Sequence, residues 1–328
     1  MVSKTITFSS PKFLSQLYCN NPKNLILVEE AFKVKITSRE NWMQIEGEAP
    51  AIKLASQLFD ILSLARTQGL IMSNADFAHV VTEIVRGHVE ELFDTFENPL
   101  ILKIREKSIV PKSINQKHYL QYIKDCPIVL GIGPAGTGKT YLAVAAALQA
   151  LLANQVSKLI LTRPAVEAGE ALGFLPGDLR EKILPYLRPL YDAMFDIIGV
   201  KEAHQLIETN IIEIAPLAYM RGRTLSNATI ILDEAQNTTP EQMMMFLTRL
   251  GENANMIVTG DITQIDLPKS KISGLKQAIQ VLSHVPDVKM HFFDNRDVIR
   301  PLIVQKVIKA YSDYFDLTES AALPFQPL

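Results

Sequence analysis

The sequence predicts an α/β protein built on a parallel β-sheet, with a small α+β unit in front of it. Three observations lead to this prediction. Between residues 116 and 312, short apolar runs alternate with helical patterns, as in parallel sheets covered on both faces. One of these runs continues through a glycine-rich loop directly into an apolar helix. Before residue 68, the patterns follow the order β-α-β-β-α.

Four regions are predicted along the 328 residues. Residues 1–68 form the small N-terminal domain, and residues 69–115 form a helix and a linker. The helix is expected to run from Ser73 or Asn74, either of which can cap it, to about Phe93. Residues 116–312 form the larger α/β domain. Residues 313–328 are predicted to be a frayed C-terminal tail.

Periodicity predicts the elements of the N-terminal domain. Apolar residues three and four positions apart indicate helices, and alternation of apolar and polar residues indicates strands. The expected strands are residues 5–8, 34–36 and 42–45, and the expected helices are residues 24–32 and 50–66. A polar turn at residues 38–41 joins the last two strands into a hairpin.

The composition excludes several classes of protein. Hydrophobic residues make up 48% of the chain and charged residues 21%, which excludes a disordered tail or a collagen-like fibre. The net charge of −2 means that any nucleic-acid surface must be a local patch. Cys19 and Cys126 are too few and too far apart for a zinc site or a disulfide framework, which favours a reducing compartment.

No targeting or membrane segment is predicted. The first residues contain no long apolar region and no small-residue cleavage site. The longest apolar stretch, Leu142 to Ala153, is interrupted by Gln149 and is too short to cross a bilayer. We therefore interpret this stretch as a buried helix and expect a cytoplasmic protein.

The glycine-rich loop matches the pattern G-x-x-x-x-G-K-[ST]. It follows the apolar run Pro127–Ile132 and opens a helix, the context in which this motif binds phosphate groups. The alternative is a glycine-rich turn that matches the pattern by accident, but such a turn would need neither the strand before it nor the helix after it. The predicted nucleotide contacts are Gly133, Pro134, Ala135, Gly136, Thr137, Gly138, Lys139 and Thr140. Lys139 would neutralise the β- and γ-phosphates, and Thr140 would bind Mg²⁺.

A second motif, Asp233 and Glu234, follows the apolar run Thr229–Leu232. Acidic residues at the carboxyl end of a buried strand lie where ligands collect in open α/β sheets. Asp233 is therefore a candidate ligand for Mg²⁺, and Glu234 a candidate general base for an attacking water. The alternative is that both acids only open a helix, where acidic residues are favoured by the helix dipole.

Two further strand ends carry polar residues. The run 256–259 is followed by Gln264, which is suited to sensing the γ-phosphate, although a solvated turn is the alternative. The run Leu159–Leu161 is followed by Arg163. The predicted catalytic residues are thus Lys139, Glu234 and Gln264.

The motifs together resemble those of the PhoH-like ATPases of bacteria. The matching segments are GIGPAGTGKTYLAV, TRPAVEAGEALGFLPGDL, LPYLRPLYDAM, YMRGRTL, ILDEAQNTT and VTGDITQIDLP, within about residues 110–312. The resemblance implies a P-loop NTPase with a RecA-like core related to that of superfamily 1 helicases. It also implies ATP and Mg²⁺ as cofactors.

The same resemblance suggests roles for further residues. It implies that Gln116 contacts adenine and that Arg163 touches a nucleic-acid strand. Arg221, Arg223 and Arg300 are candidates for an arginine finger supplied by a neighbouring subunit, and the sequence does not choose among them. The N-terminal unit resembles a KH-like domain, but its stretch Cys19–Asn24 lacks the glycines of the KH loop. This unit either contacts RNA or only braces the core.

The predicted function is ATP hydrolysis in RNA metabolism, as a helicase-like or remodelling enzyme. A single RecA-like core implies a homo-oligomer if the protein works on a strand. The alternative is a nucleotide-dependent switch that binds a ribonuclease or a ribosome-associated partner. A third hypothesis is a small-molecule kinase, with Arg180 and Arg188 in a lid over residues 169–191. Glu234 argues against the kinase, because an acid beside the metal ligand suits activation of water.

Overall fold

The structure is a computed structural model that describes residues 2–97, 99–164, 179–268, 270–294 and 297–298, with residues 303, 304, 307, 310 and 311. Only the backbone of residues 179–185 is described. The chain divides into two compact units, Met1–Asn98 with Ile299–Leu328 and Pro99–Val298. The predicted tail at 313–328 lies outside the described residues, and the domain limits at residues 68 and 115 stay predictions.

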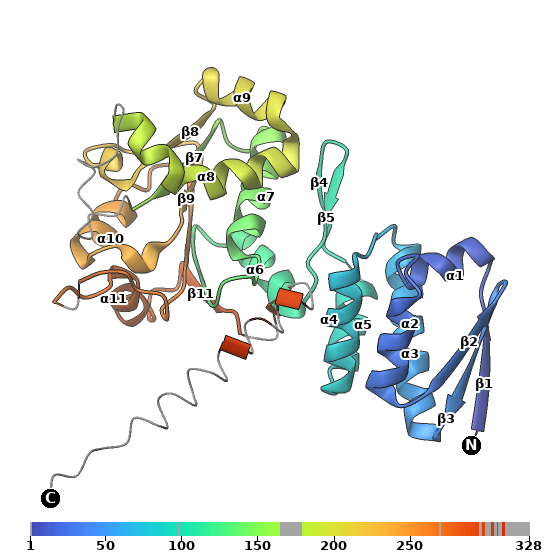
Figure 1. Ribbon diagram of the computed structural model, residues 1–328. Coiled ribbons are helices and arrows are strands. Elements are labelled where there is room, and N and C mark those ends of the chain that lie inside the picture. The colour runs from blue at the N-terminus through green and yellow to red at the C-terminus, as the bar shows by residue number, and fades with distance from the viewer. Residues whose placement is uncertain are drawn as a thin grey trace, which may run out of the picture. The chain divides into compact units, whose positions relative to one another are not determined.

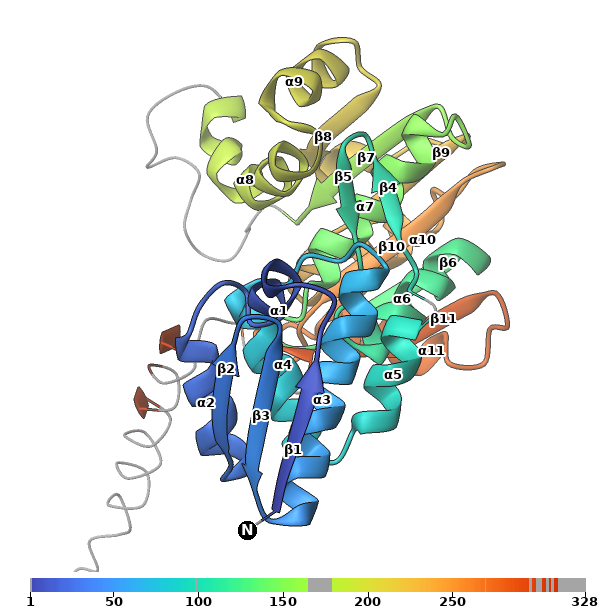
Figure 2. The same ribbon diagram turned by 90° about the vertical axis from the view of Figure 1, so that its right-hand side faces the viewer.

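The first unit contains a three-stranded antiparallel sheet in the order β1-β3-β2. Its strands are β1 (Val2–Thr7), β2 (Lys35–Arg39) and β3 (Trp42–Gly47). Helices α2 (Lys23–Phe32) and α3 (Ala49–Thr67) lie behind the sheet in the view of Figure 2. Met43 and Ile45 point from the central strand into the core and are fully buried. The predicted alternation along this strand therefore places its apolar face correctly.

Two predictions for this unit were wrong. Helix α1 (Pro11–Leu17) was missed because it is only seven residues long, although Ser10 caps it and Pro11 opens it. The helix expected from residue 73 to about 93 is two helices, α4 (Asn74–Val85) and α5 (Val89–Glu97). They separate at Gly87, whose φ of +91° lies outside the helical region. Ser73 and Asp76 form a capping box at the start of α4.

The second unit is a six-stranded sheet in the order β11-β6-β10-β9-β7-β8, with every pair parallel. Its strands are β6 (Ile128–Ile132), β7 (Lys158–Arg163), β8 (Ile212–Pro216), β9 (Ala228–Leu232), β10 (Asn255–Gly260) and β11 (Val288–Phe292). The prediction of a parallel sheet is confirmed. Because all strands point the same way, their carboxyl ends meet at one edge, where the glycine-rich loop lies.

Helices cover both faces of this sheet (Figure 1). One face carries α6 (Ile114–Asp125), α7 (Lys139–Leu152), α8 (Leu179–Ile198) and α9 (Val200–Glu208), and the other carries α10 (Pro240–Leu247) and α11 (Gly274–Val281). Each face of the sheet has its own hydrophobic core, and neighbouring strand residues alternate between the two. Val129 belongs to the core on the α7 side, and Leu130 belongs to the core on the opposite side. These continuous apolar strands are typical of a sheet buried on both sides.

A hairpin replaces part of the predicted linker. Strands β4 (Leu102–Ile104) and β5 (Lys107–Ile109) pair antiparallel across Arg105, which has a φ of 53°. Arg105 pairs with Glu202 at 2.7 Å, and Lys107 pairs with Asp196 at 2.6 Å. The sequence did not reveal the hairpin, because three-residue strands are too short to show a period. Within the part of the chain described, no helix is both long and apolar enough to cross a bilayer.

His291 on β11 makes the stability of the second unit depend on pH. Its ring stacks on Tyr119 and lies edge-on to Phe293, and its Nε2 has no hydrogen-bond partner among the described residues. Burial lowers the pKa of His291 to about 4, while Asp297 acts to raise it and His118 to lower it. The unfolded chain therefore takes up the proton first as the pH falls below about 6.5.

We expect the free energy of unfolding to decrease as the pH falls from about 6.5 towards 4, by about 1.4 kcal/mol for each unit of pKa difference. Denaturant titrations at several pH values would measure this. The decrease should shrink in His291→Gln, which carries no proton to titrate, and should persist in the control His284→Gln, since His284 is exposed. Equal pH dependence in all three proteins would show that His291 is not responsible.

Candidate functional site

The glycine-rich loop connects β6 to α7 at the carboxyl edge of the sheet. Gly136 and Gly138 have φ values of +90° and +79°, which L-residues with a side chain rarely adopt. Gly138 is the N-cap of α7, and its carbonyl accepts the first hydrogen bond of that helix from Leu142. The loop therefore wraps the amino end of α7, where free N–H groups and the helix dipole favour an anion.

Lys139, the first residue of α7, reaches back over the loop. Its Nζ donates a hydrogen bond to the Pro134 carbonyl at 3.2 Å. Burial lowers the pKa of the Lys139 ammonium from its ordinary value, and the nearby carboxylates Asp233, Asp261 and Glu234 act in the opposite direction. A cation is thus positioned between the loop and three acids.

The two predicted metal ligands face each other. The Thr140 hydroxyl donates a 2.7 Å hydrogen bond to Asp233 Oδ1, and the Thr259 hydroxyl donates to the same oxygen at 2.7 Å. Asp233 is buried, with 4% of its surface exposed. A hydroxyl beside a buried carboxylate fits Mg²⁺, which uses few protein ligands and completes its shell with water and phosphate oxygens. Within the described ranges, no group of three or more His, Cys, Asp or Glu offers an alternative metal cage.

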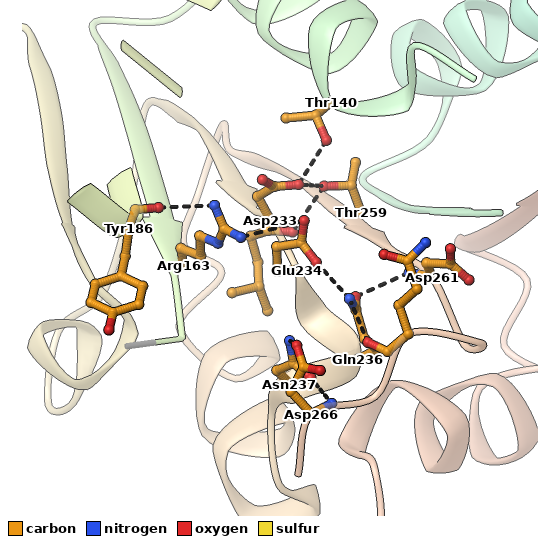
Figure 3. A network of polar contacts seen from close by, with 12 residues as sticks. Thr140, Arg163, Tyr186, Asp233, Glu234, Gln236, Asn237, Thr259, Asp261 and Asp266 are labelled. Atoms are coloured by element: carbon orange, nitrogen blue, oxygen red, sulfur yellow. Dashed lines mark hydrogen bonds and ion pairs between the residues drawn. The ribbon is translucent and has the colours of Figure 1, made fainter. Parts of the chain in front are cut away.

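Glu234 lies at the sharp turn between β9 and the short 3-10 helix Ala235–Asn237. Its φ of 54° places a residue with a side chain in the left-handed region, and such strain is common at functional sites. Its Oε2 accepts a hydrogen bond from Gln236 Nε2 at 2.5 Å, and its Oε1 lies 3.4 Å from Arg163 Nη2 (Figure 3). A short helix does begin at Ala235, as the alternative expected, and both acids precede it at the strand end.

Gln236 was missed in the sequence, although it belongs to the same segment as Asp233. Its side chain is buried and links the two loops that follow β9 and β10. Nε2 donates to the Gln264 carbonyl at 3.1 Å, and Oε1 accepts from the Asp261 amide at 3.0 Å. Gln236 therefore connects Glu234 to the segment that carries Gln264. The Gln264 side chain is exposed, and its role as a γ-phosphate sensor stays a prediction.

Asp261 is a second residue that the sequence analysis did not single out. It follows β10 directly, and its Oδ1 accepts hydrogen bonds from the Thr263 amide and hydroxyl at 2.9 and 2.6 Å. Its Oδ2 is buried and has no hydrogen-bond partner among the described residues. The position immediately after a strand run was the available signal, since Asp233 was identified by the same rule.

Gln116 lies on α6 and contacts the loop from the side. Its Nε2 donates to the Thr137 carbonyl at 2.9 Å, and its Oε1 accepts from the Lys112 amide at 2.7 Å. The side chain is buried, with 4% of its surface exposed. Gln116 therefore supports the loop in this structure, and its contact with adenine stays a prediction.

The candidate arginines differ in their surroundings. Arg223 makes two hydrogen bonds to Glu213, at 2.6 and 2.8 Å, and these bonds raise the pKa of Arg223 and lower that of Glu213. Arg221 is exposed, and no side-chain partner is found for it within the described part of the chain. Arg300 lies outside the described residues, as do residues 169–178 of the lid considered for a kinase. Arg188 of that lid is exposed on α8.

Comparison with known proteins assigns the chain to a family. The family model described as PhoH-like protein matches residues 108–312. The chain is 46% identical to a PhoH-like protein of Bacillus subtilis (strain 168) over 92% of this chain and 95% of that protein. The chain belongs to the PhoH-like protein family. Protein PhoH of Escherichia coli (strain K12), 46% identical over 77% of this chain and 75% of its own length, is another relative.

The family assignment confirms the resemblance that the motifs suggested. Together with the parallel sheet and the strand–loop–helix around Lys139, it establishes a P-loop NTPase fold for the second unit. The similarity to the Bacillus subtilis protein extends beyond this unit, since it covers nearly the whole chain. The first unit is therefore part of what these PhoH-like proteins share.

In the connection between α1 and α2 of the first unit, the backbone N–H groups are used in local hydrogen bonds. Cys19 and Asn20 have φ values of 60° and 54°, and the N–H groups of residues 19–21 all donate to nearby carbonyls. Asn74 Oδ1 accepts hydrogen bonds from the side chains of Asn21 and Asn24 at 3.1 and 2.9 Å. The resemblance to a KH-like domain would place the nucleotide-binding loop at this segment, which stays a prediction, and the N–H groups of residues 19–21 are already occupied here. Contact with a phosphate backbone would depend on side chains.

Proposed function

We propose that this protein binds ATP with Mg²⁺ at the glycine-rich loop and hydrolyses it. Thr140 and Asp233 would hold the metal ion, which neutralises charge on the phosphates when bound. Lys139 would add a second positive charge at the β- and γ-phosphates. Glu234 would take a proton from the attacking water as the γ-phosphorus forms a bond to that oxygen. The bond between the γ-phosphorus and its bridging oxygen then breaks, which leaves ADP and phosphate.

The observation that carries this proposal is the pairing of Thr140 with Asp233, with the carboxylate of Glu234 one residue further along. A hydroxyl from the loop and an acid from a neighbouring strand meet at 2.7 Å, although 93 positions separate them in the chain. The adjacent acid, Glu234, supports hydrolysis over transfer to another acceptor, because a carboxylate beside the metal ligand is suited to activating water.

We further propose that the ATPase acts in RNA metabolism, as a helicase-like or remodelling enzyme. The resemblance of the first unit to a KH-like domain and the resemblance of the second unit's motifs to those of superfamily 1 helicases support this role. The described residues contain one P-loop core, which supports a homo-oligomer if the enzyme works on a strand. Of the three candidate arginine fingers, Arg221 is the one that is described and exposed, whereas Arg223 is held by Glu213 of its own chain. A switch that loads a ribonuclease or ribosome-associated partner is the second candidate.

Steady-state ATP hydrolysis with and without single-stranded RNA tests these proposals. We expect Mg²⁺-dependent hydrolysis by the full chain and an increase on addition of RNA. Hydrolysis that ignores RNA but responds to a protein partner would favour the switch. Absence of both nucleotide binding and hydrolysis would refute the proposed activity.

A further inference from the structure

We propose that Arg163 is a positioning residue that restrains Glu234, and that a phosphodiester group of single-stranded nucleic acid competes for Arg163 and releases it. This inference rests on the proposed ATPase function. It adds a physical link by which a nucleic-acid strand would accelerate hydrolysis.

Arg163 contacts the candidate base directly. Its Nη2 lies 3.4 Å from Glu234 Oε1, and its Nη1 donates to the Tyr186 carbonyl of α8 at 2.9 Å. Figure 3 shows the guanidinium between these two groups. The Arg163 side chain is 21% exposed and that of Glu234 36% exposed, so solvent and ligands can reach this ion pair. The guanidinium therefore bridges the site and α8.

Strand order determines from which side Arg163 approaches. The sheet order runs β6-β10-β9-β7, so β7 with Arg163 lies three strands from β6, which leads into the phosphate-binding loop. At about 4.8 Å per strand, this separation is about 14 Å. Glu234 follows β9, which lies between β10 and β7. Arg163 thus reaches Glu234 from the β7 side, away from the strand that leads into the loop.

The pairing opposes the proposed role of Glu234. A guanidinium beside a carboxylate oxygen competes for the lone pairs that a water molecule needs. Gln236 holds the other oxygen, Oε2, so the carboxylate stays in place when Arg163 leaves. Loss of the Arg163 contact would therefore free Oε1 of Glu234 to accept a proton from water, while the backbone turn at Glu234 stays unchanged.

The chemistry of the guanidinium indicates the competing ligand. Arginine forms paired hydrogen bonds with phosphate oxygens as readily as with carboxylates. A phosphodiester that approaches from the β7 side can accept hydrogen bonds from the Arg163 N–H groups that now face Glu234. Because nucleic-acid strands present such groups repeatedly, they can hold Arg163 for long periods compared with a free anion.

The test compares Arg163→Gln with wild type in the full chain, with an oligouridylate as probe. Without RNA, we expect Arg163→Gln to raise kcat about three- to tenfold with the KM for ATP unchanged, and RNA to cause no further increase. In the Glu234→Gln background, the same substitution should change nothing. Arg105→Gln is the matched control, because it also removes an arginine–glutamate pair from this unit and should leave both rates as in wild type.

Each result has a defined meaning. A basal rate that is unchanged or lower in Arg163→Gln would overturn the inference, provided that thermal melting shows a folded protein. Arg163→Lys, which keeps the charge but cannot donate in two directions from one plane, serves as a second variant and should also raise the basal rate. A raised rate in a protein whose wild type ignores RNA would support the restraint and overturn the nucleic-acid ligand. Failure of wild type and both variants to hydrolyse ATP would overturn the proposed function as well.

Discussion

Replacing Lys139 with alanine is expected to abolish tight ATP binding. The Lys139 ammonium lies over the loop. Without this cation, the negative phosphates would be repelled by the nearby carboxylates of Asp233, Asp261 and Glu234. Charge-assisted hydrogen bonds of this kind contribute about 1.5–3 kcal/mol each, so affinity should fall by roughly 100-fold when more than one phosphate contact is lost. Titration with a fluorescent ATP analogue measures the change.

The control for this prediction is Lys124→Ala. Lys124 is exposed in the last turn of α6, so its loss changes the net charge equally without touching the loop. Its affinity for the analogue should match that of wild type. Nucleotide affinity that is preserved in Lys139→Ala would show that the loop binds phosphate through its backbone alone.

Replacing Glu234 with glutamine is expected to slow hydrolysis by about 100-fold or more, the usual scale for loss of a general base. Nucleotide affinity should be preserved, because glutamine has nearly the same shape and leaves Thr140 and Asp233 unchanged. Single-turnover hydrolysis and analogue binding, measured on the same preparation, separate the two effects. Glutamine also removes one charge close to Lys139, which makes the binding measurement necessary.

Glu241→Gln is the control for this variant, since Glu241 lies in the exposed first turn of α10. It removes a carboxylate seven positions further along the chain and should retain full turnover. Turnover retained in Glu234→Gln would reject Glu234 as the base. Asp261, which is buried at this edge together with Asp233, would then be the next candidate.

Local sequence predicted the elements that local chemistry specifies. The strand, loop and helix around Lys139 are contiguous, and each has a strong pattern of its own. Asp233 could likewise be placed at a strand end, because the apolar run before it is short and rich in β-branched residues, which favours a buried strand. Prediction failed where an element was short, or where the sequence signal for a break between two helices was weak. The β4–β5 hairpin is too short to show a period, and a single glycine, Gly87, divided the helix expected from 73 to 93.

The sequence by itself determined that this chain has a phosphate-binding loop and an acidic strand end, because both depend on neighbouring residues. Only the tertiary structure decided how they meet. Strand order places β10 between β6 and β9, so Thr259 and Thr140 reach the same oxygen of Asp233. It also places β7 beside β9, which brings Arg163 to Glu234. Hydrogen bonds between parallel strands are made by backbone groups that every residue carries, so the order of strands leaves no local mark in the sequence.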